Sequence, residues 1–425
     1  MKETLRKGWC PGALRPMMAR DGLLVRLRIS GGRLGADKAR ALAALAEFYG
    51  NGLFDLSARA NLQMRGIGES NLAPLLDALA DLDLLDDDPA GEAVRNVIAS
   101  PLAGLGGGLD IGPLVAALEA RLTRDPALHA LPGKFGFLID DGSDPSLAGV
   151  PADVRFDAVR EDTSWRFWIG LGGTRDHAEP LGFCAPGEIV EAANWIGRTF
   201  LTLAEKTHPR VRRMEGLIER LGRYQTARAF GGDGGAPRLP YSGAILNPPP
   251  VGLTGADGYP ALGIAAPFGR FDHHMLRVAA NIADESGNGE LRLTPWRCLL
   301  LPDVRVIPPD HGLGAVGFIL DPSDARLRIA ACVGQAGCEH ASTPTHADAE
   351  ALWGVVSHFE GAAIAIHVSG CQKGCAKASR TPITLVGRDG LYDLVENGRA
   401  SDIPVKRDLD LDSAHAAIVA LRRRV

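Results

Sequence analysis

Apolar and polar residues in the first part of the chain predict a strand, a helix and a further strand. Residues 23–29 alternate in the manner of a β-strand with one buried face. Between residues 39 and 46, alanine and leucine recur at the i, i+3, i+4 and i+7 positions of an amphipathic helix. A glycine-asparagine-glycine triplet at 50–52 is expected to end this helix, because the chain leaving a helix favours a left-handed backbone. A new strand is predicted from Phe54.

The same order of elements occurs a second time. The segment 32–62 matches the segment 269–299 without a gap, at an offset of 237 residues (269 minus 32). The glycine-asparagine-glycine triplet recurs in register at 287–289, which shared composition alone does not explain. Each copy predicts a β-α-β-β unit of α+β type, so the chain is expected to be built from two duplicated halves.

A glycine- and proline-rich segment separates the two halves. Four glycines surround an aspartate at 231–235, which is typical of a flexible linker. Three consecutive prolines at 248–250 indicate a stiffer stretch. We therefore predict a boundary near residues 225–240.

Composition adds the expected class of protein. The chain has 425 residues, of which 46% are hydrophobic and 23% are charged, as in soluble proteins of two or three domains. A net charge of −5 gives no reason to expect a nucleic acid or membrane partner. Neither a signal peptide nor a membrane span is visible, and seven cysteines do not fit a secreted disulfide framework. A cytoplasmic protein is expected.

Four of the cysteines form two tight motifs near the C-terminus. Cys332 and Cys338 give C-x5-C, Cys371 and Cys375 give C-x3-C, and 32 residues separate the two motifs. Each motif follows a predicted strand, and four thiolates from two loops can hold a [4Fe–4S] cluster. Two alternatives stay open: cysteines buried as small hydrophobes, and a structural zinc site, which favours shorter spacings.

Basic residues in the first half form a second candidate set. Arg59 and Arg65 lie on one predicted strand, and Arg95 and Lys134 lie near strand ends. Each one alone is most simply a solvated surface charge. Together, guanidinium groups would suit a ligand with many carboxylates, which arginine binds bidentately. Arg297, one position past the repeat equivalent of Arg59, is expected to reach the same pocket from the second half.

The remaining cysteines and the nearby histidines receive no functional role. Cys184 and Cys298 are expected to be buried, and Cys10 has no assigned role. A single histidine is more often a packed or surface residue than a metal ligand. No ligand role is therefore assigned to the histidines near the cysteine motifs, which are His340, His346 and His367.

Several motifs together resemble the sulfite and nitrite reductase superfamily over nearly the whole chain. They are the cysteine spacing, the duplicated halves, an S-x-R-x-x-x-Q-x-x-G strand from Ser57, R-N-V at 95–97 and L-P-x-K-F at 131–135. The resemblance implies that the four cysteines hold a [4Fe–4S] cluster beside a tetrapyrrole, with Cys375 the nearest to it. It also implies catalytic roles for Arg59, Arg95 and Lys134.

The resemblance further implies the fold and its divisions. Each half would be a ferredoxin-like β-α-β-β unit with a larger mixed α/β lobe. The expected divisions are a first ferredoxin-like half-domain, its lobe, a linker with the second half-domain, and a second lobe with the cysteines, at 1–85, 86–230, 231–305 and 306–425.

Two departures from the reductases narrow the expected activity. The second lysine of their K-F-K motif is Gly136 here, and their C-P-N-G-C loop reads C-Q-K-G-C from Cys371. Losing a cation weakens both proton delivery and the binding of an oxyanion. Within the superfamily the chain most resembles the precorrin-3B synthases of cobalamin biosynthesis. That resemblance implies O2-dependent hydroxylation of precorrin-3A at C20, with formation of a γ-lactone.

The expected cofactors and partners follow from this resemblance. They are the [4Fe–4S] cluster, a second non-haem iron or a sirohaem, and a reductant that is NADH or an electron carrier. The expected partners are precorrin-3A, O2 and the electron donor, for a monomer with no nucleic acid or membrane partner. The main alternative is a sirohaem-dependent sulfite or nitrite reductase. A third hypothesis is an electron carrier or a zinc-stabilised binding protein.

Overall fold

The computed structural model describes most of the chain as twenty strands and eleven α-helices. The described residues are 11–106, 108–232, 235–239, 249–255, 259–307, 312–356 and 364–422. The strands are β1 Met17–Ala19, β2 Gly22–Leu27, β3 Arg33–Gly35, β4 Leu53–Leu56, β5 Leu62–Ile67, β6 Val97–Ala99, β7 Phe137–Asp140, β8 Ala152–Glu161, β9 Ser164–Gly173, β10 Glu179–Cys184, β11 Gly252–Thr254, β12 Ala261–Ala265, β13 Arg270–Asp272, β14 Glu290–Leu293, β15 Cys298–Pro302, β16 Ile329–Ala331, β17 Ile366–Ser369, β18 Thr381–Arg388, β19 Leu391–Gly398 and β20 Lys406–Leu409. The helices are α1 Ala36–Tyr49, α2 Leu72–Asp81, α3 Pro89–Val94, α4 Gly112–Arg124, α5 Ile189–Glu205, α6 Met214–Leu221, α7 Arg223–Ala229, α8 His273–Ser286, α9 Thr345–Ala351, α10 Trp353–Val356 and α11 Leu411–Arg422. Within these residues, no helix combines the length and apolarity needed to span a bilayer.

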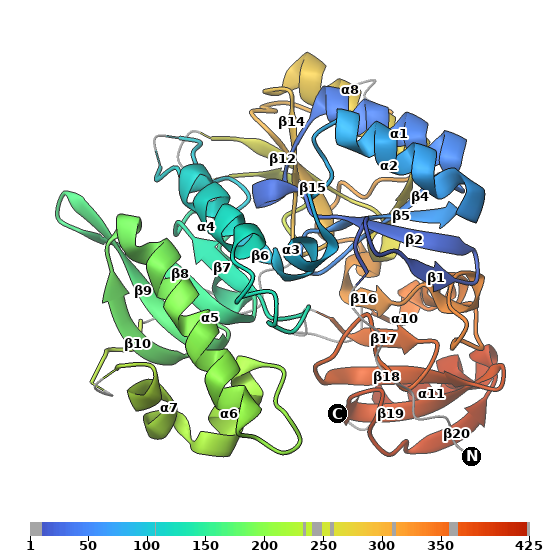
Figure 1. Ribbon diagram of the computed structural model, residues 1–425. Coiled ribbons are helices and arrows are strands. Elements are labelled where there is room, and N and C mark those ends of the chain that lie inside the picture. The colour runs from blue at the N-terminus through green and yellow to red at the C-terminus, as the bar shows by residue number, and fades with distance from the viewer. Residues whose placement is uncertain are drawn as a thin grey trace.

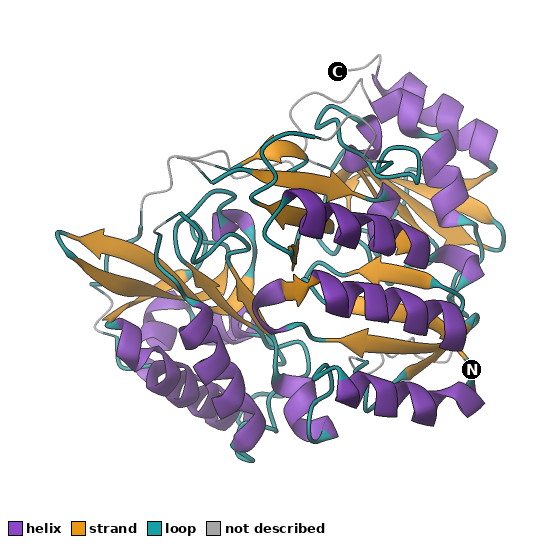
Figure 2. Cartoon of the chain, turned by 90° about the horizontal axis from the view of Figure 1, so that it is seen from above, coloured by secondary structure: helices purple, strands orange, loops and turns teal. Residues whose placement is uncertain are grey.

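Each of the two central sheets contains one strand from the other half of the chain. Their orders are β1-β2-β5-β4-β13 and β11-β12-β15-β14-β3. Strand β13 pairs antiparallel with β4, and β3 pairs antiparallel with β14. Phe54 lies opposite Phe271 across the first exchange, and the two rings stack with centroids 5.7 Å apart. Helices α1 and α8 lie side by side on these sheets (Figures 1 and 2), and one hydrophobic core joins both halves.

The sequence repeat is also a structural repeat. Helices α1 and α8 begin at residues 36 and 273, and β4 and β14 begin at 53 and 290, so both pairs keep the offset of 237 residues. Gly32 and Gly269, just before the exchanged strands, both have a positive φ, of 68° and 79°. The predicted α+β fold with two duplicated ferredoxin-like halves is confirmed.

The end of helix α1 differs in detail from the prediction. Gly50 has φ −129°, which is extended, whereas Gly52 has φ +74° and donates its N–H to the Ala46 carbonyl at 3.0 Å. A Cβ at Gly50 would lie 2.5 Å from the Arg65 carbonyl oxygen. The two glycines therefore serve different needs, since one allows a close approach and the other a left-handed turn.

Each half also carries a lobe with its own five-stranded sheet. The orders are β6-β7-β8-β9-β10 and β16-β17-β18-β19-β20. In both lobes the first three strands are parallel and the last two are antiparallel to their neighbours. Figure 1 shows the first lobe at the lower left and the second at the lower right, below the central sheets.

The predicted linker is only partly a loop. Helix α7 runs to Ala229, inside the boundary predicted at 225–240, because Phe230 and Ala227 are buried in the first lobe. Residues 233–234 and 240–248 lie outside the described residues. The exchanged strands also join the expected divisions 1–85 and 231–305 across the boundaries at 85 and 230, and all the expected divisions stay predictions.

Candidate functional site

The four cysteine thiols of the two motifs lie together at one edge of the second lobe. Cys332 follows β16, and Cys371 comes two residues after β17, its parallel neighbour. The carboxyl ends of parallel neighbouring strands meet at the same edge of a sheet. Partial burial raises the pKa of Cys375, and the charges of Cys371, Cys332 and Cys338 raise it further. All four thiols are free and close enough to influence one another.

Backbone N–H groups in these loops point at the sulfurs. Gly370 N–H donates to Cys332 Sγ at 3.2 Å. Burial raises the pKa of Cys371, and a hydrogen bond from the Lys373 backbone lowers it. A Cβ at Gly370 would lie 2.5 Å from the Ala341 Cβ, so this position requires glycine. Such N–H groups tune the potential of an iron–sulfur cluster.

Within the described residues, the four thiols do not form the compact ligand set of a single metal ion. Among the residues that the structure describes, no three His, Cys, Asp or Glu side chains could hold a single metal ion. A zinc site would hold its sulfurs within about 2.3 Å of the ion. Four cysteine thiolates are also the ligand set of a [4Fe–4S] cluster, in which each thiolate binds a different iron atom.

One predicted basic residue acts on a thiol through its charge, and a second bonds to the backbone of the first. The Lys134 cation, from the first lobe, lowers the pKa of Cys375, although burial and the other thiols outweigh it. Arg59 Nη2 donates to the Lys134 carbonyl at 3.3 Å. Arg59 lies between β4 and β5 of a central sheet, and Lys134 lies just before β7. Three parts of the chain therefore converge near Cys375.

Arg95 lies in a different environment. It donates to both carboxylate oxygens of Asp86, at 2.6 and 2.8 Å, and lies 3.5 Å from Glu119. It also donates to the Arg28 carbonyl at 2.9 Å. Its side chain is 12% exposed. These contacts tie the segment before β6 to the central sheet, and they do not bring Arg95 to Lys134 or to the cysteines.

Arg65 links the central sheet to the first cysteine motif. It donates to both carboxylate oxygens of Asp21, at 2.8 and 2.7 Å, and to Asp55 at 3.1 Å. Its Nη2 also donates to the Gly337 carbonyl, next to Cys338, at 2.9 Å. Asp21 and Asp55 therefore neutralise the charge of Arg65, and its hydrogen bond to Gly337 positions the loop that carries Cys338.

Gly136, which replaces a lysine of the resembling reductases, is not required by packing. A Cβ there would have one neighbour within 4 Å, the Asn96 carbonyl oxygen at 3.7 Å, which is an ordinary contact. The residue is also not among those with a positive φ. A Cβ would fit at this position, so the backbone conformation and the immediate packing do not require glycine.

Next to the site lies a cavity, of which the sequence predicted only one lining residue, Arg297. It has a volume of about 250 Å³ and is lined by residues from both halves, including Arg297 and Lys377. Arg297 was expected to reach a shared pocket, and the structure places it on this cavity. Lys377 was not predicted as a site residue. It lies only two residues after Cys375, and this closeness to the cysteine motif could have indicated it.

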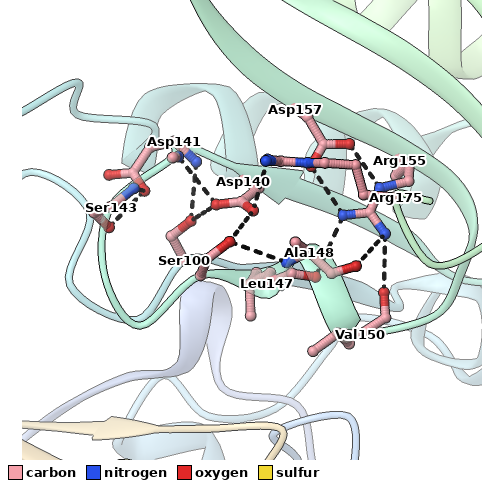
Figure 3. Close-up of polar contacts among 12 residues, drawn as sticks. Ser100, Asp140, Asp141, Ser143, Leu147, Ala148, Val150, Arg155, Asp157 and Arg175 are labelled. Atoms are coloured by element: carbon pink, nitrogen blue, oxygen red, sulfur yellow. Dashed lines mark hydrogen bonds and ion pairs between the residues drawn. The ribbon is translucent and has the colours of Figure 1, made fainter. Parts of the chain in front are cut away.

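A buried polar network fixes the loop that contributes Ser146 and Gly149 to this cavity (Figure 3). Arg155 is fully buried and binds both carboxylate oxygens of Asp157, at 2.6 and 2.9 Å. It also donates to three carbonyls of the loop, which belong to Leu147, Ala148 and Val150. Arg175 joins Asp157 to Asp140, and burial raises the pKa of Asp140.

The other cysteines and the histidines have separate environments. Cys184 and Cys298 are buried as predicted, and burial raises the pKa of each to about 12. Cys10 lies outside the described residues. Burial lowers the pKa of His346 and of His367 to about 4. Within the described part of the chain, neither ring nitrogen of the fully buried His367 has a hydrogen-bond partner.

These two histidines predict a pH-dependent stability. Their folded pKa of about 4 lies below the ordinary value of 6.5, so the unfolded chain binds protons first as the pH falls. The stabilisation is complete above pH 6.5 and is lost as the pH falls through about 4. At pH 5 we expect a loss of about 2 kcal/mol per histidine in the free energy of unfolding, measured by urea denaturation.

His367→Phe should make that pH dependence shallower, because phenylalanine keeps the packing and cannot bind a proton. His415→Gln is the control, since His415 is exposed. An unchanged difference between pH 7 and pH 5 in His367→Phe would contradict the assignment.

Comparisons with known proteins identify the family to which the two halves are related. The nitrite/sulfite reductase ferredoxin-like half domain family matches residues 15–82 and 253–306, one match in each half. A precorrin-3B synthase from Sinorhizobium sp. is 31% identical over 94% of this chain and 85% of its own length. The hemoprotein beta-component of an NADPH sulfite reductase from Acidithiobacillus ferrooxidans is 27% identical over 88% of this chain and 76% of its own length.

A solved structure extends the similarity to the fold. The Mycobacterium tuberculosis NirA protein superposes with a TM-score of 0.73, covering 95% of this chain and 80% of its own. Its sequence identity is 23%, so this likeness concerns the fold alone. The fold and both half-domain matches thus agree with the duplicated architecture described above.

Proposed function

We propose, from the premise that this chain belongs to the precorrin-3B synthase family of the nitrite and sulfite reductase superfamily, that it hydroxylates precorrin-3A with O2. One oxygen atom would form a bond to C20 of the macrocycle, and the ring A acetate would close a γ-lactone. The other oxygen atom would leave as water, which consumes two electrons from a reductant and two protons. The superfamily consists of oxidoreductases, which supports this class of reaction.

The observation that carries the proposal is the set of groups around Cys375. Lys134 and Arg59 come from the first half and supply cations, while position 136 supplies none. A polycarboxylate macrocycle needs cations at its rim, whereas reduction of a small oxyanion needs them concentrated on one atom. The present set suits the macrocycle better than sulfite or nitrite.

The residues have distinct roles in this proposal. Cys332, Cys338, Cys371 and Cys375 would hold the [4Fe–4S] cluster, which supplies single electrons when bound. Lys134 and Arg59 would bind carboxylates and orient the macrocycle. Arg95, expected to be catalytic, would instead support the site from outside, through Asp86 and Glu119.

Labelled O2 tests the proposal directly. Purified protein, precorrin-3A, a reductant and isotopically labelled O2 should give a lactone carrying one labelled oxygen atom. Lys134→Met should lower kcat/KM roughly tenfold to a hundredfold, as loss of one positioned cation does. Lys38→Met, which removes an exposed lysine paired with Asp83, is the matched control.

Two outcomes would contradict the proposal. One is the absence of any oxygenated product from protein that carries the full cluster. The other is rapid consumption of sulfite or nitrite by the same preparation, which would favour the reductase alternative.

A further inference from the structure

The cavity beside the cysteine loop is a meeting point of both halves. Ala58, next to Arg59, contributes from the first half, and Ala376 and Lys377 contribute from directly behind Cys375. Pro295 and Arg297 contribute from the equivalent turn of the second half. The cavity therefore lies next to Arg59 and Cys375, whose chain neighbours Ala58 and Ala376 line it.

Two cations on this cavity lack an acidic partner. Within the described residues, no carboxylate forms an ion pair with Arg297 or Lys377, and Arg297 Nη2 donates to the Ala376 carbonyl at 3.0 Å. Arg326, a third cation on the lining, is by contrast paired with Asp324 and Glu350.

The two cations lie close together along this wall, because Arg297 bonds to the carbonyl of Ala376, the residue just before Lys377, and both side chains line the cavity. Burial lowers the pKa of Arg297, while Asp55 and Cys332 act in the opposite direction. Asp55 is already bound by Arg65 and Arg270. Two half-buried like charges that no carboxylate neutralises are costly, and an entering anion removes that cost.

The backbone is built to present Arg297 there. Arg297 has φ +62°, a left-handed conformation that is unfavourable for a residue other than glycine and that is found at many functional sites. A Cβ on Gly269 would lie 2.9 Å from the Arg297 Cβ, so glycine at 269 makes room for this side chain.

We infer that Arg297 and Lys377 bind one carboxylate arm of the tetrapyrrole inside this cavity. The inference rests on the proposed function. A volume of about 250 Å³ lies below the roughly 300–1,000 Å³ of pockets that enclose a whole ligand, so the cavity takes an acetate or propionate arm and not the macrocycle. The macrocycle would then lie outside the cavity mouth, beside Cys375 and Lys134.

Binding of uroporphyrin III, a macrocycle with acetate and propionate arms, tests the inference without turnover. In a fluorescence titration of the cluster-loaded protein, Lys377→Gln and Arg297→Gln should each weaken binding roughly tenfold or more. Lys377→Arg should stay within about threefold of the unmodified protein, because it keeps the charge. Arg305→Gln is the matched control and should not change binding, because Arg305 is an exposed arginine that pairs with Asp303 and does not line the cavity.

The outcomes separate this inference from the proposed function. Weaker uroporphyrin binding in both glutamine variants, with no hydroxylation of precorrin-3A by the unmodified protein, would support the inference and reject the proposed function. Hydroxylation together with unchanged uroporphyrin binding in both variants would overturn the inference. Loss of iron in the variants with unchanged binding would also overturn it, because the cations would then serve the cluster.

Discussion

Cys375→Ala is expected to purify with at least tenfold less iron and acid-labile sulfide than the unmodified protein. The reason is that a [4Fe–4S] cluster needs all four thiolates, and the described residues near Cys375 include no spare ligand set for a metal ion. Iron and sulfide analysis after anaerobic purification, with an optical spectrum, measures the effect. The same loss is expected for Cys332, Cys338 and Cys371.

Cys184→Ala is the matched control for this experiment. Cys184 is also a free cysteine, but it is buried in the first lobe, and burial raises its pKa to about 12. Its variant should keep the iron and sulfide of the unmodified protein. Full iron content in Cys375→Ala would remove Cys375 from the ligand set.

Arg155→Met is expected to destabilise the first lobe by about 3–5 kcal/mol. The substitution leaves Asp157 with only Arg175 and removes the donor of three loop carbonyls, all in a fully buried place (Figure 3). Chemical denaturation followed by the fluorescence of the buried Trp168, which lies on the neighbouring strand β9, measures the free energy of unfolding.

The control for this prediction is an exposed pair on the same strands. Arg166 on β9 lies 3.5 Å from Glu161 on β8, and their side chains are 43% and 48% exposed. Arg166→Met should cost at most about 1 kcal/mol. Equal effects of the two substitutions would show that the buried network does not stabilise the lobe.

Features that appear along the chain as a repeat or as a fixed spacing between residues could be predicted from the sequence. The duplication of the two halves is visible in the gapless match of 32–62 with 269–299 and in the paired glycine triplets. The two cysteine motifs follow parallel neighbouring strands, so the local pattern was enough to expect four thiols at one edge. Their role as cluster ligands stays a prediction.

Features that depend on which distant groups meet could not be predicted in this way. Arg95 looks like any arginine near a strand end, and only the fold reveals its pairing with Asp86 and Glu119. The left-handed backbone of Arg297 has no sequence signature, because such a conformation is imposed by its surroundings. Strands β3 and β13 are three residues long, which is too short for a periodic pattern.

The exchange of β3 and β13 has a consequence for how the protein can be divided. Neither central sheet is complete with residues from one half, so a half expressed alone would expose an unpaired edge beside β4 or β14. Two halves expressed separately would complete their sheets only by exchanging these strands, as the subunits of a domain-swapped dimer do. A circular permutation that opens the chain after helix α7 and the buried Phe230 keeps both exchanges and therefore preserves the sheets, whereas cutting the chain there into independent domains does not.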